Sequence, residues 1–412
     1  MATEKKQRRK QGMGGIHQRK SDGIYVGYVT LPDDPRTGKR RRKWVSSKTR
    51  AGVEKKLRDL RKDLDRAGDL PTSSPQLRKW LELHDERHLS TLKPRAAAAA
   101  RSAIRNYIVP SIGKVRLERL TATHIYKMHD YVIKELELSS STANQAHRVL
   151  RKALADAVEH QGLSRNVADI VSPPATAVVQ RKALGADEAK ALMYAHRKEP
   201  LTALRLAVAL LTGMRQGECL GLTWGAINLD RKIITVSWQL QNISYVHGCE
   251  PSCGKKRAIQ CPDKKFDYPH GQEIIQVRGA LHLLRPKSRK GWREIPLAPI
   301  LADMLKAYKK EHAKPHEHDL VFLRNDATPL PPRQDAELWK QALAKAKLPH
   351  VPLHSARHTT ATLLHELGVP EQVRMQILGH ASATVTQGYT HISSGEAAAA
   401  MGQLGDLLAL DA

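Results

Sequence analysis

The sequence predicts a mainly α-helical protein with small β-sheets, arranged in three regions. Stretches 23–30 and 40–45 are rich in β-branched and aromatic residues, which is typical of strands, and a charged helix follows them. Residues 76–172 place apolar side chains at helical spacing almost throughout. From 183 onward, helices alternate with short strands, which predicts a mixed α/β region.

The first region, 1–67, is expected to be a basic N-terminal tail, a three-stranded sheet and one helix. Turn residues at 32–38 separate the strands, and the helix opens at Thr49 and runs to about Arg66. A basic sheet can enter a DNA groove, so we predict DNA contacts there; the alternative is a solvated hairpin. The residues proposed for these contacts are Arg40, Arg41, Arg42 and Lys43.

The net charge of +27 is unevenly distributed and points to a nucleic-acid partner. Residues 1–62 hold 20 Lys and Arg against 6 Asp and Glu, about half of the excess. A charge that serves only solubility is the alternative. No apolar run approaches the roughly 18 residues needed to span a membrane, and the charged N-terminus is no secretion signal. We therefore expect a cytoplasmic protein without a membrane partner, whose four cysteines form no disulfide framework.

The second region, 75–172, is predicted to be a four-helix unit. Leu77, Trp80, Leu81 and His84 fall on one face of its first helix, and a helix capped by Ser139 runs to about 161. Basic residues lie beside the apolar stripe of that last helix and are predicted to face phosphates. They are Arg148, Arg151 and Lys152.

The third region, 180–412, carries the residues suited to chemistry. Helices are expected at 186–197 and 200–212, and a strand at 232–237. A polar insert, 247–272, follows. Two strands, 282–284 and 293–297, are expected to be joined by the basic loop 285–292, with helices from there to the C-terminus.

Four segments of this region together match the needs of phosphodiester cleavage. They are TGMRQGE at 212–218, the loop around Lys287, HSARHT at 354–359, and LGH at 378–380 with Tyr389 nine residues later. Cleavage requires cations on the non-bridging oxygens, a nucleophile, a base and an acid for the leaving oxygen. Arg215 and Arg357 supply forked cations. His354 lies three residues before Arg357, so both are expected on one helix face.

These segments resemble the signature motifs of the tyrosine recombinases, specifically the phage-type integrases. The match covers about 180–400, and the upstream regions resemble the arm-type DNA-binding sheet and helical core-binding domain of that family. The resemblance implies a site-specific recombinase that integrates, and in some systems excises, a mobile element. It also implies a 3′-phosphotyrosine intermediate, with no ATP and no catalytic metal.

The resemblance also implies a role for each matched position. Arg215 and Arg357 would hold the scissile phosphate, with Glu218 orienting the first arginine motif, and His354 would manage the proton of the nucleophile. His380, at a position that can be Trp in the family, would donate a hydrogen bond to the phosphate. Lys287, on a β-hairpin, would be the general acid, and Tyr389 would be the nucleophile. Lys290 in the same loop is the alternative to Lys287. The usual HDLRH motif reads HSARH here, and the two differing positions are not catalytic.

The implied partners are double-stranded DNA attachment sites, a homotetramer on that DNA, an excisionase and a host DNA-bending protein. The apolar tail with Ala397, Leu404 and Leu408 has two open interpretations, docking on a neighbouring protomer or packing on its own chain. Two rival functions share the motifs: a type IB topoisomerase-like enzyme, and an inactive DNA-binding protein. The basic N-terminal sheet argues against the first, and the complete catalytic set argues against the second.

Cysteines gather in the polar insert. Cys249, Cys253 and Cys261, together with His247 or His270, could supply four ligands to a structural zinc ion. The spacing is not that of a standard zinc finger, and a polar loop with reduced thiols is the alternative. A small insert with little core would gain most from a metal.

Overall fold

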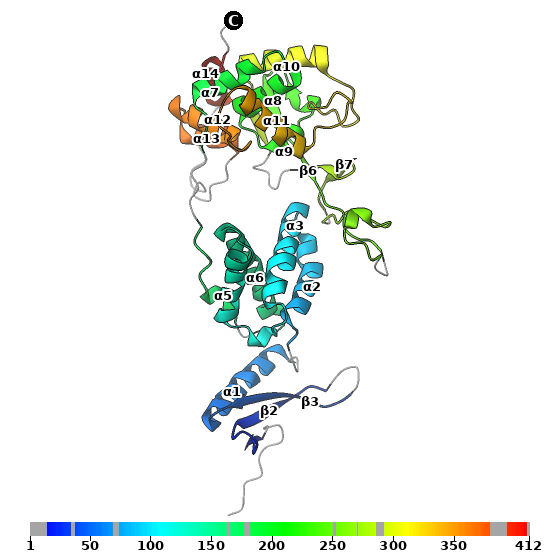
Figure 1. Cartoon of the computed structure of the whole chain (residues 1–412), viewed down its shortest axis with the longest axis vertical. Helices are drawn as coiled ribbons and strands as arrows, with labels where there is room; N and C mark the ends of the chain where they lie inside the picture. The colour runs from blue at the N-terminus through cyan, green and yellow to red at the C-terminus, as the bar shows by residue number, and fades with distance from the viewer. Residues whose placement is uncertain are drawn as a thin grey trace, which may run out of the picture. The chain divides into compact units, whose positions relative to one another are not determined.

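The computed structural model describes residues 15–33, 38–68, 74–161, 163, 165–176, 182–249, 253–269, 271–285, 292–379 and 394–409. The chain separates into two units, Met1–Val178 and Val179–Ala412. None of the helices in the described ranges is long and apolar enough to cross a membrane. The mainly α-helical fold with small sheets is confirmed (Figure 1).

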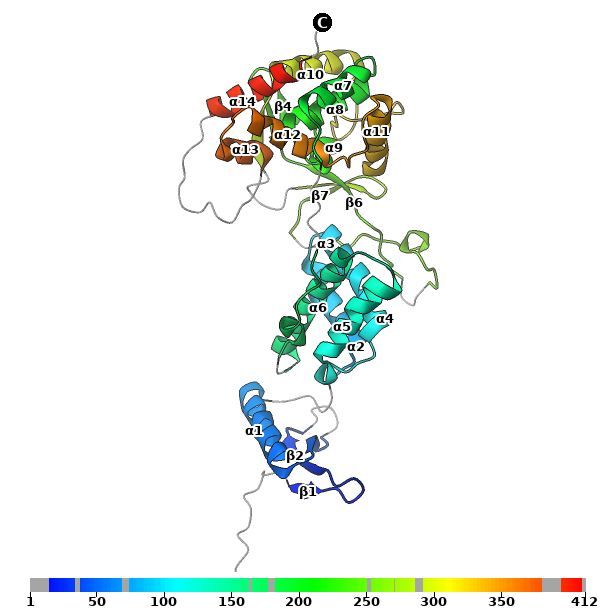
Figure 2. The same cartoon turned by 60° about the vertical axis from the view of Figure 1, so that its left-hand side comes forward.

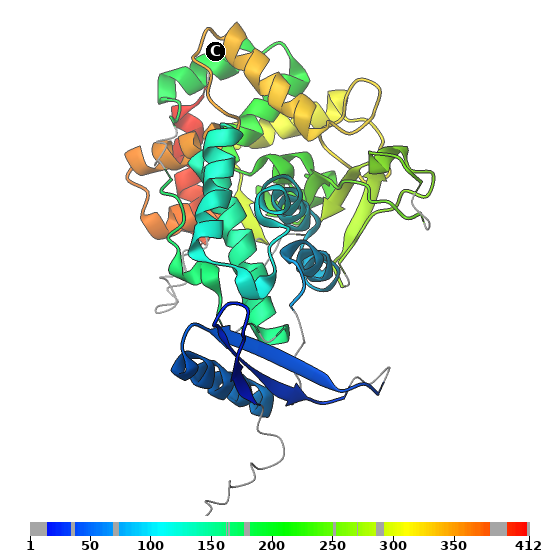
Figure 3. The same ribbon diagram turned by 60° about the horizontal axis from the view of Figure 1, so that its bottom comes forward.

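An antiparallel sheet and one helix form the first part of the N-terminal unit. Its strands, in sheet order, are β1 (Ile16–Gln18), β2 (Tyr25–Leu31) and β3 (Arg41–Ser47). Helix α1 (Arg50–Ala67) begins where the Thr49 hydroxyl accepts a hydrogen bond from the Gly52 backbone. It covers one face of the sheet, where Val29, Val53 and Leu57 are buried (Figure 3). The opposite face presents Trp44, which is 53% exposed.

The rest of this unit is helical, as the apolar spacing predicts (Figure 2). The helices are α2 (Leu77–Arg87), α3 (Pro94–Ala103), α4 (Val109–Ile112), α5 (Ala122–Asp130) and α6 (Ser140–His160), with π-helical turns at Ile104–Ile108 and Tyr131–Glu135. Trp80 is buried against α6 and donates its indole N–H to the Ala153 carbonyl at 2.8 Å. The predicted stripe of α6 faces this core through Leu150 and Leu154.

The C-terminal unit is built around α8 (Pro200–Thr212), whose second half is buried on all sides. The other helices are α7 (Ala186–Ala195), α9 (Gln216–Leu220), α10 (Pro299–His312), α11 (Pro332–Lys345), α12 (Ser355–Glu366), α13 (Glu371–Leu378) and α14 (Ser394–Leu407). Two antiparallel sheets accompany them. The first sheet has the order β4 (Ile227–Asn228), β5 (Ile233–Val236) and β9 (Arg293–Pro296). The second has the order β6 (Gln239–Asn242), β8 (Leu281–Leu284) and β7 (Ile274–Arg278).

The predicted pairing across the basic loop is wrong. Strand β8 lies between β6 and β7, so both of its edges are occupied, and β9 pairs with β5 in the other sheet. The two strands that flank Lys287 therefore do not form a hairpin with each other. Instead, β7 and β8 form one, closed by the turn at Gly279 and Ala280.

The described part of the C-terminal tail packs on its own unit. In α14, Ala397, Met401 and Leu404 are buried, and Leu408 follows them into the same core. The helix contacts α8, α10, α13 and β9. In this structure the tail thus supports its own C-terminal unit.

Candidate active site

Arg215 and Glu218 lie where α8 gives way to α9. Helix α8 is capped at its C-terminal end by Gly213, whose φ of 60° is left-handed, and Arg215 is the residue directly before α9. The Glu218 carboxylate accepts hydrogen bonds from the Arg215 backbone N–H and from its guanidinium, both at 2.9 Å. The turn thereby orients the Arg215 side chain, which remains 42% exposed, beside the Glu218 side chain, which is fully buried.

A second basic residue, Arg293 at the start of β9, also binds the Glu218 carboxylate. Its guanidinium donates to both Glu218 oxygens, at 2.9 and 3.3 Å, and its side chain is 5% exposed. No motif marked this residue, and the sequence interpretation missed it. The alternation of β9 could have revealed it, because Arg293 shares the inward face of the strand with the fully buried Ile295.

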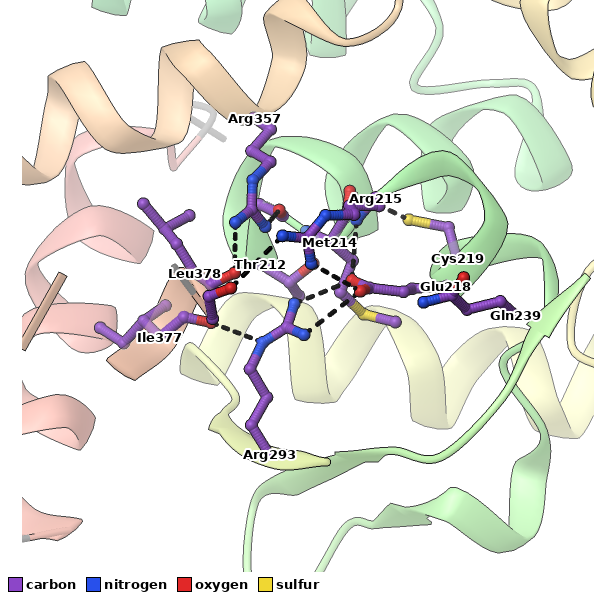
Figure 4. A network of polar contacts seen from close by, with 12 residues as sticks. Thr212, Met214, Arg215, Glu218, Cys219, Gln239, Arg293, Arg357, Ile377 and Leu378 are labelled. Atoms are coloured by element: carbon purple, nitrogen blue, oxygen red, sulfur yellow. Dashed lines mark hydrogen bonds and ion pairs between the residues drawn. The ribbon is translucent and has the colours of Figure 1, made fainter. Parts of the chain in front are cut away.

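Arg215, Arg293 and Arg357 all donate hydrogen bonds to backbone carbonyls at the C-terminal end of α13 (Figure 4). Arg293 donates to the carbonyl of Ile377 at 2.9 Å, and Arg215 to that of Gly379 at 3.3 Å. Arg357 on α12 donates to the intervening Leu378 carbonyl and, at 2.8 Å, to that of Gly213. The last carbonyls of a helix lack intrahelical partners and carry partial negative charge, so they suit guanidinium donors. The first two residues of the LGH motif, Leu378 and Gly379, are thus hydrogen-bonded to the arginines through their carbonyls.

Close packing requires glycine at the two ends of this network. At Gly379, with φ of 66°, a Cβ atom would lie 3.0 Å from the Arg293 side chain. At Gly213, a Cβ atom would lie 2.5 Å from Leu378. A side chain at either position would separate the arginines from the carbonyls that they contact.

The network carries an excess of positive charge. Burial and the nearby charges of Arg215 and Arg293 lower the pKa of Arg357 to about 9, which leaves its guanidinium protonated at neutral pH. Burial would raise the pKa of Glu218, but its hydrogen bonds and ion pairs with Arg293 and Arg215 lower it overall, so it is ionised. Three cations then face one carboxylate, and an anion such as a phosphodiester would relieve their repulsion.

His354 lies directly before α12 and is exposed, whereas Arg357 is 4% exposed. The rings of His354 and His358 meet edge to face, with centroids 5.0 Å apart. The positions that depart from the usual motif, Ser355 and Ala356, are buried. Thr360 donates its hydroxyl to the Leu210 carbonyl at 2.8 Å, which holds α12 against α8 and places Arg357 beside Gly213.

Three of the predicted catalytic residues, Lys287, His380 and Tyr389, lie outside the described residues, as does Lys290. The described chain brings together Arg215, Arg357 and Glu218 from two separate motifs. It adds Arg293 to them.

The predicted DNA-contact residues have different surroundings. On β3, successive side chains alternate between faces, so Arg42 lies over the Tyr28 ring on the open face while Arg41 and Lys43 lie on the other. Arg40 precedes the strand and is exposed. On α6, Arg148, Arg151 and Lys152 are all exposed, but two of them form ion pairs within the chain: Arg151 with Asp169 at 2.6 Å and Lys152 with Asp156 at 2.7 Å.

The predicted metal ligands meet in the insert. The side-chain ligand atoms of His247, Cys249, Cys253 and Cys261 all lie within 4.8 Å of one another. The alternative imidazole, His270, lies outside the described residues.

Comparison with known proteins gives a consistent result. Residues 271–396 match the model of the phage integrase family, and residues 76–133 match that of the phage integrase N-terminal SAM-like domain. An integrase of Saccharopolyspora erythraea is 27% identical over 404 residues, covering 90% of this chain and 91% of the relative. An integrase of Streptomyces ambofaciens is 24% identical and covers 92% of each chain.

Solved structures share the fold. The Tn1549 transposon integrase bound to transposon right-end DNA superposes with a TM-score of 0.59 at 19% identity, over 80% of this chain and 100% of that chain. A lambda integrase dimer bound to a COC′ core site gives 0.54 at 17% identity, over 92% and 94%.

Proposed function

We propose that Tyr389 is the nucleophile of this chain, which belongs to the tyrosine recombinase family and is a site-specific integrase of the phage type. One observation carries the assignment of the site. Three arginines donate hydrogen bonds to the carbonyls of residues 377–379, directly before His380, and Glu218 binds two of these arginines, Arg215 and Arg293. The cation cluster is therefore attached to the start of the segment that bears the proposed nucleophile.

Arg215 is best suited to contact the scissile phosphate first, because its side chain is the most exposed of the three. Arg357 lies beside it and supplies the second cation. Arg293 and Glu218 are positioning residues, since the ion pairs between them are buried and hold Arg215 in place. These charges would stabilise the pentacoordinate phosphorus as negative charge builds on its oxygens.

In the proposed reaction, the Tyr389 oxygen forms a bond to phosphorus while the bond to the 5′-oxygen breaks. His354 accepts the phenolic proton, Lys287 donates a proton to the leaving 5′-oxygen, and His380 donates a hydrogen bond to the phosphate. The 3′-phosphotyrosine is itself a diester, so a second 5′-hydroxyl can attack it without ATP. The proposed residues also supply the required cations without a catalytic metal.

The proposed substrate is a pair of double-stranded DNA attachment sites bound by four copies of the chain. Support comes from related proteins, since a lambda integrase with the same fold, at a TM-score of 0.53, was solved as a tetramer on a Holliday junction. The open face of the N-terminal sheet, with Arg42 and Trp44, is the proposed contact to a second DNA site. An excisionase and a host DNA-bending protein are proposed accessory partners.

A half-site substrate with a nick near the cleavage position tests the nucleophile, because loss of a short fragment traps the covalent complex. The wild-type chain should give a protein–DNA adduct that survives denaturant, and Tyr389→Phe should bind DNA but give none. Adducts formed by Tyr389→Phe would overturn the assignment. Recombination between two supplied sites, compared with relaxation of supercoiled DNA, separates the integrase from a topoisomerase-like enzyme.

A further inference from the structure

The insert between β6 and β7 brings three thiols and one imidazole to a single point. The Cys253 sulfur lies 3.5 Å from Nδ1 of His247, and the Cys249 sulfur lies 4.0 Å from it. Cys261 joins them, with all four ligand atoms within 4.8 Å of one another. None of the four cysteines is in a disulfide.

The two sulfur–nitrogen separations are close to the edges of a metal tetrahedron. Zinc binds sulfur at about 2.3 Å and imidazole nitrogen at about 2.0 Å, so two ligands at a tetrahedral angle lie roughly 3.5–3.8 Å apart. The observed sulfur–nitrogen distances of 3.5 and 4.0 Å lie near that range. Small movements of the side chains would bring four ligands to one ion.

Aromatic rings, Tyr245, Phe266 and Tyr268, stack at the base of the insert, but its outer part, 247–265, has almost no apolar core in the described residues. Between 247 and 265, Cys261 is the one buried residue among those described, at 2% exposure. The ligand atoms of the other three candidates lie within 4.8 Å of its sulfur. A small module without a core is stabilised most by a metal, because coordination replaces the missing burial.

The backbone around the cluster is arranged for sulfur ligands. Val246 and Lys265 exchange backbone hydrogen bonds at 2.8 and 3.1 Å, which closes a two-stranded stem at the base of the cluster. Two residues after Val246, Gly248 passes so close to the Asp263 carbonyl that a Cβ atom would lie 2.2 Å from it. The Cys253 backbone N–H donates to the Cys249 sulfur at 3.3 Å, a contact that favours a thiolate.

The charge of the surroundings also fits. Three thiolates around a divalent ion leave one net negative charge, and exposed cations surround the cluster in sequence. They are Lys255, Lys256, Arg257, Lys264 and Lys265.

We propose that the insert binds one structural zinc ion through Cys249, Cys253, Cys261 and Nδ1 of His247. Four protein ligands leave no open position, so the ion joins the two halves of the insert and takes no part in DNA cleavage. The proposal does not depend on the assignment of Tyr389.

The test begins with the full-length wild-type chain, purified under reducing conditions without a metal-affinity tag or chelator. Elemental analysis should find one zinc per chain, and three thiols should resist a thiol reagent until a chelator is added. Replacement by Co²⁺ should produce the thiolate-to-cobalt charge-transfer band and the visible bands of a tetrahedral site. A chain with less than about a tenth of an equivalent of zinc, no uptake of Co²⁺ and three thiols that react at once would overturn the proposal.

Variants then identify the ligands. Cys261→Ser should lose the zinc, whereas Cys219→Ser should retain it, because Cys219 is a buried thiol on α9 outside the cluster. His247→Ala should lose or weaken zinc binding, and His270→Ala should not. Loss of zinc from His270→Ala with full retention in His247→Ala would refute the proposed ligand set.

Discussion

Neutralising Glu218 tests the arrangement of the arginines most directly. This carboxylate is fully buried and accepts four hydrogen bonds, two from Arg215 and two from Arg293. Glu218→Gln keeps the shape of the side chain but removes its charge. It also turns an amide N–H₂ group toward guanidinium donors, so Arg293 stays buried without its counter-charge.

The expected cost follows from burial. Removing one partner of a buried ion pair typically destabilises a protein by about 3–5 kcal/mol, since the remaining charge stays out of water. The pKa of Arg357 is already lowered to about 9 by burial, Arg215 and Arg293, and Glu218 opposes that shift. Loss of the carboxylate therefore increases repulsion among all three arginines. We expect a loss of about 3–5 kcal/mol within the C-terminal unit.

Hydrogen exchange of α8 and α9 amides in the full-length chain measures this loss, because it reports stability locally in a chain of two units. The adduct assay, run where the variant is still folded, should show slower formation of the covalent complex. Leu305→Ala is the matched control: Leu305 is fully buried in α10, and the truncation costs about 2–5 kcal/mol without touching the arginines. Adding Arg293→Met to Glu218→Gln should recover part of the stability, because it removes the unmatched charge.

A change below about 1 kcal/mol in Glu218→Gln, with unchanged adduct formation, would contradict this reasoning. So would an equal loss of adduct formation in Leu305→Ala.

Three further predictions concern other sites. Gly379→Ala should destabilise the C-terminal unit by about 1–3 kcal/mol, because the φ of 66° disfavours a side chain and a Cβ atom would lie 3.0 Å from the Arg293 side chain. Equal hydrogen-exchange rates in the wild type and the variant would refute this. His129, in a buried pair with His147, has a pKa lowered to about 4 by burial and then by His147, so the unfolded state binds the extra proton below about pH 6.5. Exchange of α6 amides should report about 2 kcal/mol less stability at pH 5 than at pH 7.5, and His129→Gln should remove most of that difference. Trp44→Ala should leave stability nearly unchanged, because the side chain is 53% exposed, yet weaken DNA binding by the N-terminal unit roughly fivefold; unchanged affinity in a shift assay would exclude this face.

The sequence alone determined much of the local structure and singled out the residues of the candidate site. Helix α8 begins and ends at the predicted residues 200 and 212, and Ser139 caps α6, because apolar spacing and caps act within a few residues. The motifs around Arg215 and Arg357 were recognisable for the same reason. Each is a short, continuous segment.

Tertiary structure decided what depends on distant partners. Arg293 joined the site through contacts to Glu218 and Ile377, which are 75 and 84 residues away along the chain. Strand β9 paired with β5 rather than β8, since β8 already had a neighbour on each edge. The apolar face of the tail packs around Leu404 in the core of its own unit, a contact that the sequence left open. Pairings such as these depend on which surfaces meet in the folded chain, and that is not encoded in any single segment.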